Sequence, residues 1–559
     1  MSTLQQPPTH TAPVPGGRVL LRGGVLAGAT ADEDGGPSAS AAAPTALVLD
    51  GSTVAWVGDE EGAAAWTNRV DRVVDLRGAL VTPGFADAHV HLTMTGQGLD
   101  GVDLSATRSV GEALDLVEQA VRRRRGRPVY AHSWDETRWA EGRPVTSAEL
   151  DRASYGGVVY MPRVDAHSAS VSTAMATIAR VREIDGWDGS GVVRRDAFAA
   201  ATNAFTTALT PADREHHVSL ALDAAAAAGI TLLHEMGAAH LTSHDDIRDV
   251  LAHGEGPGVP DVVTYWGELV PDADAAAELA GFLGVLGLAG DLCADGSFGS
   301  FTAHVEQPYL GSPSGGREDG HHVGFGYLGV DEVRDHVLAC TRAGLQAGGH
   351  VIGDAALRTM ATGFRAAADE LGVEALRAAR HRWEHVELPS PQVLATMGEL
   401  GIWASVQPVF DALWGGAEGM YAARLGPERA LAALPLRDMV DAGVRLALGS
   451  DSPVTPLGPW AAVRAAVLHH NPDQRLTPAE AFAAHTVAGH ELAGRTGGHL
   501  RAGAPATYVV WDDGQPGRGP VPTDPTTGLP TALDDPDLPL PVARLTVVSG
   551  QVAHDREGA

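Results

Sequence analysis

The stretch VTPGFADAHVHLT, residues 81–93, decides how the rest of the chain is interpreted. A Pro-Gly turn is followed by a short apolar run that ends in His89 and His91, with one residue between them. On a β-strand, side chains two positions apart lie on the same face, so both imidazoles would point the same way. Two neutral imidazoles that converge on one point favour a metal site, and such sites are typical of the carboxyl-terminal mouth of a barrel. For a bare His-x-His, two unrelated polar residues at a strand end are the alternative.

Outward from this stretch, residues 81–490 alternate between short apolar runs and longer runs rich in Ala, Leu and Arg. Examples are GITLLHEM after LALDAAAAAG and VRLALGSD after LPLRDMVDAG. Alternation of this kind indicates βα units and a parallel sheet. A segment of roughly 400 residues suits a (β/α)8 TIM barrel with insertions. About residues 111–210 contain few clear βα units, so we expect an inserted subdomain over the barrel mouth.

Both ends of the chain have a different character. VLLRGGVL, TALVLDG and STVAWVGD near the N-terminus, and ATYVVWDDG (506–514) and VARLTVVSGQVAHD (542–555) near the C-terminus, predict short strands bounded by Gly and Asp-Gly turns. We therefore expect residues 1–80 and 491–559 to form one composite β-sandwich domain beside an α/β barrel of residues 81–490.

The charge balance excludes some partners. The 559 residues contain 40 Lys+Arg and 70 Asp+Glu, a formal net charge of −30. Contacts to phosphates need clustered cations, so we expect neither a nucleic-acid partner nor binding to an anionic membrane. The sequence contains no lysine, which excludes a Lys Schiff base and a carbamylated Lys.

Other features bear on the compartment. No apolar run approaches the roughly 18 residues of a membrane span. The first seventeen residues are polar and Pro-rich and lack the basic and apolar regions of a signal peptide. Two cysteines, Cys293 and Cys340, cannot build a disulfide scaffold. We expect a cytoplasmic protein.

Three more candidate ligands stand at the ends of strand-like runs. His350 lies in GLQAGGHVIGDAA, His385 in RHRWEHVEL and Asp451 in VRLALGSDSPV. A single histidine of this kind is more often a hydrogen-bonded core residue. A barrel, however, brings successive strand ends to one mouth, where histidines and a carboxylate suit a site for one or two divalent metal ions.

The ordered motifs TPGFxDxHxH, GGHVIGD, RxEH and GSDSPV resemble the metal-dependent amidohydrolase superfamily. WDETRW (134–139), RVDAHSA (163–169), ADGSFGSFTA (294–303) and SVQPVF (405–410) are similar to its YtcJ-like branch, amidohydrolase family 3, which includes N-substituted formamide deformylases. The resemblance covers nearly the whole chain and implies the same barrel and composite β-sandwich.

The resemblance also implies roles for individual residues. His89 and His91 match the first-strand metal ligands, His350 the fifth-strand ligand, His385 the sixth-strand ligand and Asp451 the eighth-strand ligand. Asp451 would also act as general base, and His385 would polarise the water or stabilise the oxyanion. The implied cofactor is a divalent metal, with Zn²⁺ expected.

One position departs from the family. In this branch a Lys commonly precedes the DGS motif by four positions, and here Asp291 stands in that place. Asp291 could bridge two ions, although its side chain is short for that task. Glu235, in LLHEMG, could supply the carboxylate instead, or a single ion could bind through His89, His91, His350 and Asp451. An ordinary turn or cap role for Asp291 is the fourth interpretation.

Candidate substrate-binding residues come from the branch motifs. They are Arg163, Asp165 and His167 of RVDAHSA, Trp134 of WDETRW and Gln407 of SVQP. For each of them a structural hydrogen bond or a place in the core is the alternative.

Taken together, the sequence predicts a metal-dependent hydrolase that cleaves a non-peptide carbon–nitrogen bond, an amide or N-substituted formamide, in a small molecule. A deaminase of the same superfamily is a second hypothesis, although no Glu follows His350 in VIGD. A non-catalytic ligand-binding protein on a degenerate fold is the third. The sequence leaves open whether the protein forms a homodimer.

Overall fold

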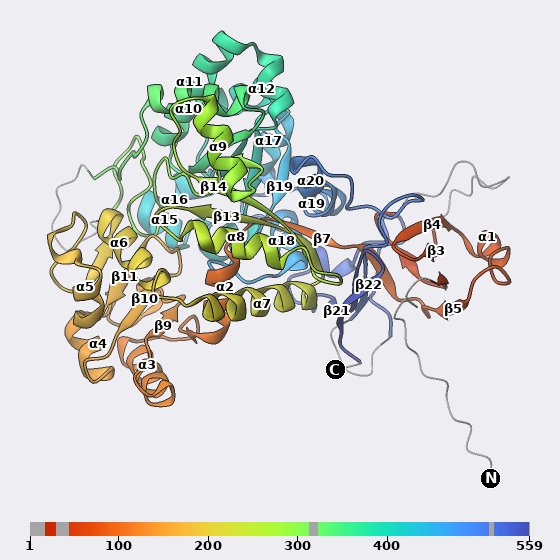
Figure 1. The fold of residues 1–559 in the computed structure, drawn as a ribbon, viewed down its shortest axis with the longest axis horizontal. Helices are drawn as coiled ribbons and strands as arrows, with labels where there is room; N and C mark the ends of the chain where they lie inside the picture. The colour runs from red at the N-terminus through yellow and green to blue at the C-terminus, as the bar shows by residue number, and fades with distance from the viewer. Residues whose placement is uncertain (1–16, 30–43, 312–321, 514–518, 558–559) are drawn as a thin grey trace.

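The computed structural model describes residues 17–29, 44–311, 322–513 and 519–557. Residues 1–16, which bear on the signal-peptide expectation, lie outside this part. Eight parallel strands follow one another in chain order, confirming the predicted (β/α)8 barrel (Figure 1). They are β7 (Phe85–Val90), β13 (Ile230–Ala238), β14 (Asp261–Gly267), β15 (Gly287–Leu288), β16 (Gln346–Val351), β17 (Arg382–His385), β18 (Trp403–Val406) and β19 (Leu446–Leu448).

Backbone hydrogen bonds join β7 to the segment that follows β19. The Asp451 N–H donates to the His89 carbonyl at 2.8 Å, and the His91 N–H donates to the Ser452 carbonyl at 2.9 Å. The first and last strands of the barrel therefore lie side by side, and their candidate ligands share one edge.

Helices cover the outside of the barrel, as parallel strands buried on both faces require. They are α7 (Pro211–Ala227), α8 (His244–His253), α9 (Ala273–Leu283), α10 (Val330–Arg342), α11 (Asp354–Leu371), α12 (Val373–Ala379), α13 (Pro391–Leu400), α17 (Leu436–Asp441), α18 (Pro459–Val467), α19 (Pro478–Ala484) and α20 (Val487–Leu492). Local signals set their ends. Thr210 and Asp213 form a capping box before α7, with Pro211 in the first turn.

Three further helices follow strand ends at the barrel mouth. They are α2 (Leu92–Asp100) after β7, and α14 (Pro408–Trp414) and α15 (Met420–Leu425) after β18. At the opposite end of β7, Phe85 packs edge-to-face on Trp460, Phe482 and Trp511, with ring centroids 4.9, 5.5 and 5.8 Å away. This aromatic cluster anchors the first strand of the barrel.

The inserted subdomain is a second, five-stranded sheet that lies beside the barrel (Figure 1). Its order is β12-β11-β10-β9-β8. Its strands are β8 (Val102–Asp103), β9 (Val129–His132), β10 (Val159–Pro162), β11 (Ser168–Val171) and β12 (Val192–Arg194), and its helices are α3 (Val110–Arg124), α4 (Ser147–Ala153), α5 (Thr173–Ile178) and α6 (Arg195–Thr206). The sheet begins before residue 111, where we expected the insertion to start, because β8 is too short to leave a periodic signal.

Two small sheets lie beside the barrel, and the second of them contains strands from both chain ends. One holds β1 (Arg18–Arg22), β3 (Ala46–Asp50), β4 (Thr53–Gly58) and β5 (Arg72–Asp75), and the other β2 (Val25–Leu26), β6 (Leu80–Pro83), β20 (Tyr508–Asp512), β21 (Val542–Val548) and β22 (Gln551–Asp555). Leu47 and Val54 share one apolar core with Val81, Val510 and Leu545. Since β6 runs on into β7, this pair of sheets connects directly to the first barrel strand. Within the described residues, none of the helices has the length and apolar content that crossing a bilayer demands.

Candidate metal centre

His89 lies at the inner face of β7 and is fully buried. Its Nδ1 is 2.8 Å from Glu384 Oε2 and donates to this carboxylate, which leaves Nε2 to face the site. Nε2 faces Asp451 Oδ1 at 3.4 Å and Asp291 Oδ1 at 3.6 Å. In the described part of the chain, this Nε2 has no hydrogen-bond partner.

His91 directly follows β7 and is the N-cap residue of α2. Its Nε2 lies 3.2 Å from Asp291 Oδ2 and 3.2 Å from Asp451 Oδ1. The two histidines of the His-x-His pair thus converge on the same two carboxylates, as their alternation on the strand predicts.

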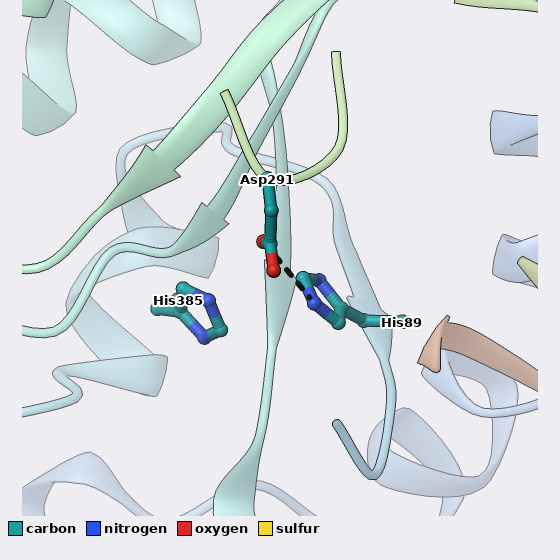
Figure 2. A group of neighbouring side chains, drawn as sticks. All are labelled: His89, Asp291 and His385. Atoms are coloured by element: carbon teal, nitrogen blue, oxygen red, sulfur yellow. Dashed lines mark ion pairs between the residues drawn. The ribbon is translucent and has the colours of Figure 1, made fainter. Parts of the chain in front are cut away.

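Asp291 sits in the loop after β15, and Figure 2 shows its carboxylate pointing towards His89, with His385 on the other side. The loop after β15 passes so close to the end of β14 that a Cβ on Gly267 would lie 2.4 Å from Leu292 N. Because Gly267 has no side chain, the loop can bring the Asp291 carboxylate to the cluster. Burial alone would raise the pKa of the Asp291 carboxyl, but the imidazoles of His91 and His89 hold it well below its usual range. The structure therefore places Asp291 inside the cluster.

Glu235, on β13, pairs in register with Val90 of β7, between His89 and His91. Its Oε2 accepts a hydrogen bond from the Leu92 N–H at 2.6 Å, at the start of α2, and burial raises its pKa to about 8. A carboxyl held in this way supports a helix N-terminus, and the alternative that Glu235 replaces the missing Lys stays a prediction.

His385 ends β17 and Asp451 follows β19, both in the left-handed backbone region with φ of 71° and 55°. Strained backbone of this kind persists where the surrounding structure enforces it, and it gathers at functional sites. The His385 Nδ1 is 2.8 Å from Gln407 Oε1, which leaves Nε2 free to face the site. Gln407 thus orients His385, and its predicted contact with substrate stays a prediction.

His350, at the end of β16, is the least clear member of the ligand set. Its ring centroid lies 4.5 Å from that of His385, but its Nε2 is 3.1 Å from the Gly296 carbonyl. Burial and the neighbouring His167 lower its pKa to about 4, so it is a neutral imidazole. Its role as a ligand stays a prediction.

The donor atoms fit a divalent metal. His89, His91 and Asp451 form one group of ligand atoms within 4.8 Å of one another, and His89, Asp291 and His385 form another. Neutral imidazole nitrogens with carboxylate oxygens are the ligands that Zn²⁺ and related ions take in hydrolases. The buried His89 Nε2 and Asp291 Oδ1, both without a hydrogen-bond partner in the described residues, are the atoms that a cation would satisfy.

Buried charged side chains behind these residues hold the cluster in place, and they were not predicted from the sequence. The Arg382 Nε donates to Glu384 Oε1 at 2.6 Å, and its Nη1 is 2.9 Å from His234 Nδ1. All three side chains are buried in the barrel. The available signal was the alternation Arg-Trp-Glu in β17, which places Arg382 and Glu384 on the face opposite Trp383.

A cavity of about 280 Å³, here called the inner chamber, opens beside the cluster and is lined by His91, Asp291, His350, His385 and Asp451. The insertion contributes Asp165 and His167 to its wall, in agreement with their proposed place near substrate. His240, Cys293 and Tyr327 also line it and were not among the candidate site residues taken from the sequence.

Arg163 supports Asp165 from behind. Its guanidinium pairs with Asp165 at 3.0 Å, Asp135 at 3.1 Å and Glu136 at 2.8 Å, and it is 3% exposed. Asp165 in turn accepts hydrogen bonds from Ser297 and Ser300 of the barrel. Arg163 thus acts through this cluster and lines no part of the inner chamber described here.

The prediction that Trp134 lines the substrate pocket is wrong. Its ring stacks on Trp139 at 5.5 Å within the apolar core of the insertion, and its Nε1 donates to the Met161 carbonyl at 2.9 Å. A buried indole whose N–H is satisfied by backbone is a core residue.

Comparisons with known proteins agree with this geometry. The sequence matches the amidohydrolase family over residues 72–554. It is 25% identical to the YtcJ protein of Bacillus subtilis (strain 168) over 523 residues, 86% of this chain and 90% of the relative. It is also 25% identical to N-substituted formamide deformylase of Arthrobacter pascens over 552 residues, 92% and 95% of the two chains.

A solved structure supports the fold. The uncharacterized metal-dependent hydrolase of Pyrococcus horikoshii OT3 superposes with a TM-score of 0.67 at 21% identity, covering 91% of this chain and 98% of that one. The family match and the clustered His and Asp ligands establish that a divalent metal is the cofactor and a small molecule the substrate. This chain belongs to the amidohydrolase family and is a metal-dependent hydrolase of carbon–nitrogen bonds other than peptide bonds.

Proposed function

We propose that the chain hydrolyses a small N-substituted amide or formamide at the edge of the inner chamber, with Asp451 as the general base. The convergence of His91, Asp291, His385 and Asp451 on one wall of this chamber, with His89 directly behind them, is the observation that carries the proposal. Resemblance to an N-substituted formamide deformylase along most of its length favours this substrate class.

His89, His91, Asp291, His385 and Asp451 would hold the metal, which we propose is a single Zn²⁺. The two groups of ligand atoms share His89, whose Nδ1 is engaged by Glu384, so only Nε2 is available to both. One imidazole nitrogen ligates one ion, which favours one ion over two. When bound, a divalent ion supplies Lewis acidity and lowers the pKa of water to about 7.

Asp451 is placed to accept a proton and to return it during the reaction. Its Oδ1 lies 3.2 Å from His91 Nε2 and its side chain borders the inner chamber. It would accept a proton from the attacking water as the new C–O bond forms, and return it to the nitrogen as the C–N bond breaks. The products are a carboxylic acid and an amine.

One further side chain would hold the substrate, and a second would hold the insertion over it. The ring of His167 lies 4.8 Å from that of His350, at the wall of the inner chamber. Asp165, fixed by Arg163, Ser297 and Ser300, borders the same space. We assign His167 as a donor to the substrate carbonyl and Asp165 as the group that keeps the insertion docked above it.

The test is metal analysis of the purified protein together with activity on a panel of formamides, acyl amides and cyclic imides. We expect one equivalent of metal and turnover of at least one open-chain amide or formamide. A protein that takes up neither Zn²⁺ nor Mn²⁺ would instead support the non-catalytic hypothesis. Turnover confined to amino-heterocycles would support the deaminase.

A further inference from the structure

Two side chains at the wall of the inner chamber have no part in the proposed chemistry. Cys293 lies in the loop after β15, two residues beyond Asp291, and its backbone pairs with that of His350 in β16. His240 follows the end of β13 by two residues. Both side chains line the inner chamber, and the Cys293 Sγ lies 3.7 Å from the His240 Nε2. The fold therefore brings a thiol and an imidazole from separate strand ends together beside the metal centre.

Proximity of the two groups is not enough to make a site, as the other cysteine of the chain shows. The Cys340 Sγ lies 3.6 Å from the His336 Nε2, both on α10. That Nε2, however, is 2.8 Å from the Leu288 carbonyl, and the His336 Nδ1 accepts from the Val270 N–H at 3.4 Å. Cys340 is also fully buried in the barrel core. This pair therefore has no nitrogen left for a cation, and its sulfur is closed to solvent.

The pair of Cys293 and His240 differs in both respects. Both residues are partly exposed, and both line the inner chamber. Their contact is a weak hydrogen bond, since sulfur is a poor donor and a poor acceptor. One proton lies between Sγ and Nε2, whichever atom carries it. A cation that replaces this proton would meet a lone pair from each of the two atoms.

The spacing of the two donors suits one metal ion. Zinc binds thiolate sulfur at about 2.3 Å and imidazole nitrogen at about 2.0–2.1 Å with tetrahedral angles, so two such donors lie about 3.5–3.6 Å apart. The separation of 3.7 Å between Sγ and Nε2 agrees with that value. Water can complete the coordination, because the chamber volume of about 280 Å³ exceeds the roughly 30 Å³ that one water molecule takes up in the liquid.

The donor types select the cation. A thiolate and an imidazole favour soft or borderline ions such as Zn²⁺ and Cd²⁺, whereas Mg²⁺, Ca²⁺ and Mn²⁺ prefer oxygen ligands. Two protein donors also hold an ion less tightly than the five that we assign to the metal centre. This second position therefore fills only after the metal centre, when a soft cation is present in excess.

We propose that Cys293 and His240 form a second cation site, for Zn²⁺ or another soft divalent ion, and that an ion bound there inhibits the enzyme. On binding, a sulfur–metal bond forms and the thiol releases its proton to the solvent. The ion and its waters occupy part of a chamber that also borders Asp291, His385 and Asp451, so they compete with substrate for this space. The cation site stands on its two residues alone, whereas the inhibition rests on the proposed function.

The binding test uses the full chain with its metal centre already filled by Zn²⁺. Titration with Cd²⁺ is followed through the ultraviolet absorption that a cadmium–thiolate bond produces. Because the proposed ligands of the metal centre are imidazoles and carboxylates, only a cysteine can give this band. We expect the band to saturate at one thiolate-bound Cd²⁺ per chain in the wild type and in Cys340→Ala, the matched control. In Cys293→Ala it should be absent.

His240→Gln tests whether the imidazole takes part. Loss of a group that merely orients a metal ligand weakens binding by about 10–100-fold, so loss of the imidazole itself should weaken Cd²⁺ binding by at least about tenfold. A band that persists in Cys293→Ala, or no band in the wild type, would overturn the site. Equal Cd²⁺ affinity in His240→Gln and the wild type would reduce the site to a single thiol and overturn the pair.

Inhibition is measured separately, on a substrate identified from the amide panel. Excess Zn²⁺ should abolish turnover in the wild type and in Cys340→Ala but not in Cys293→Ala, each compared with its own rate at one equivalent of metal. Excess Mn²⁺ should inhibit none of them. If Cd²⁺ binds as expected but the panel shows no turnover, the cation site stands and the amide hydrolase proposal fails. If turnover is normal and Zn²⁺ inhibits the wild type and Cys293→Ala alike, the inhibitory role is wrong.

Discussion

The barrel and the insertion contribute to one site in different ways. The barrel supplies His89, Asp291, His385 and Asp451 from the ends of four strands, each held by the strand that carries it. The insertion supplies the turn around Asp165, which a buried ion cluster fixes over the mouth, and residues of α6 that line the inner chamber. This contrast suggests that the barrel determines the chemistry and the insertion determines which molecules reach it.

The largest effect is expected at a barrel carboxylate. Asp451→Asn removes the proposed base and should lower kcat by about 10²–10⁴-fold, while the fold is retained. Metal content must be measured in the same sample, because Asp451 is also a proposed ligand. Asp369→Asn, an exposed change on α11, is the control and should leave turnover unchanged. Near-wild-type turnover of the Asp451 variant would refute the base assignment.

The next effect concerns the insertion. Arg163→Met leaves the buried carboxylates of Asp135 and Asp165 without their shared cation, which typically costs about 3–5 kcal/mol, whereas Glu136 keeps its pair with Arg424. Hydrogen exchange should show faster opening in β9–β11 than in the barrel strands. Arg365→Met, which removes an exposed pair with Glu399, should change neither region. Equal loss of protection in barrel and insertion would mean that the two do not open separately.

The same contrast explains what could be predicted from the sequence. His89, His91 and Asp451 were predictable because each stands at the end of an apolar run, where barrel topology brings it to the mouth. The arrangement in the insertion was not, since its strands are short and its aromatic residues pack on one another. Trp134 was misassigned for that reason: an indole in a polar motif has the same sequence signature whether it faces a cavity or a core.

Asp291 shows another limit. Its place in the sequence was evident, but whether so short a side chain could reach the cluster depends on how closely the loop after β15 approaches β14. That distance is set by a glycine on a different strand, Gly267. Contacts between segments far apart in sequence carry no local signal, so only the fold reveals them.

A smaller effect is expected where one barrel residue orients another. Gln407→Leu removes the acceptor that faces His385 Nδ1, and should weaken metal affinity or activity by about 10–100-fold. Gln407→Glu keeps an acceptor at this position and should restore metal affinity. Titration with a chelator gives the affinity separately from turnover. If both variants bind metal as the wild type does, Gln407 has no part in orienting the ligand.

The smallest effect is a pH dependence of stability in the barrel wall. His381 is buried, its Nδ1 accepts from the Ala347 N–H at 2.9 Å, and burial lowers its pKa to about 3. The unfolded chain takes up a proton near pH 6.5 while the folded chain does not, so stability falls as the pH drops from about 6.5 towards 3. The slope from this group is at most about 1.4 kcal/mol per pH unit. His381→Gln should reduce the slope of the unfolding free energy against pH in urea titrations between pH 4 and 7, and an unchanged slope would mean that His381 is protonated in the folded barrel.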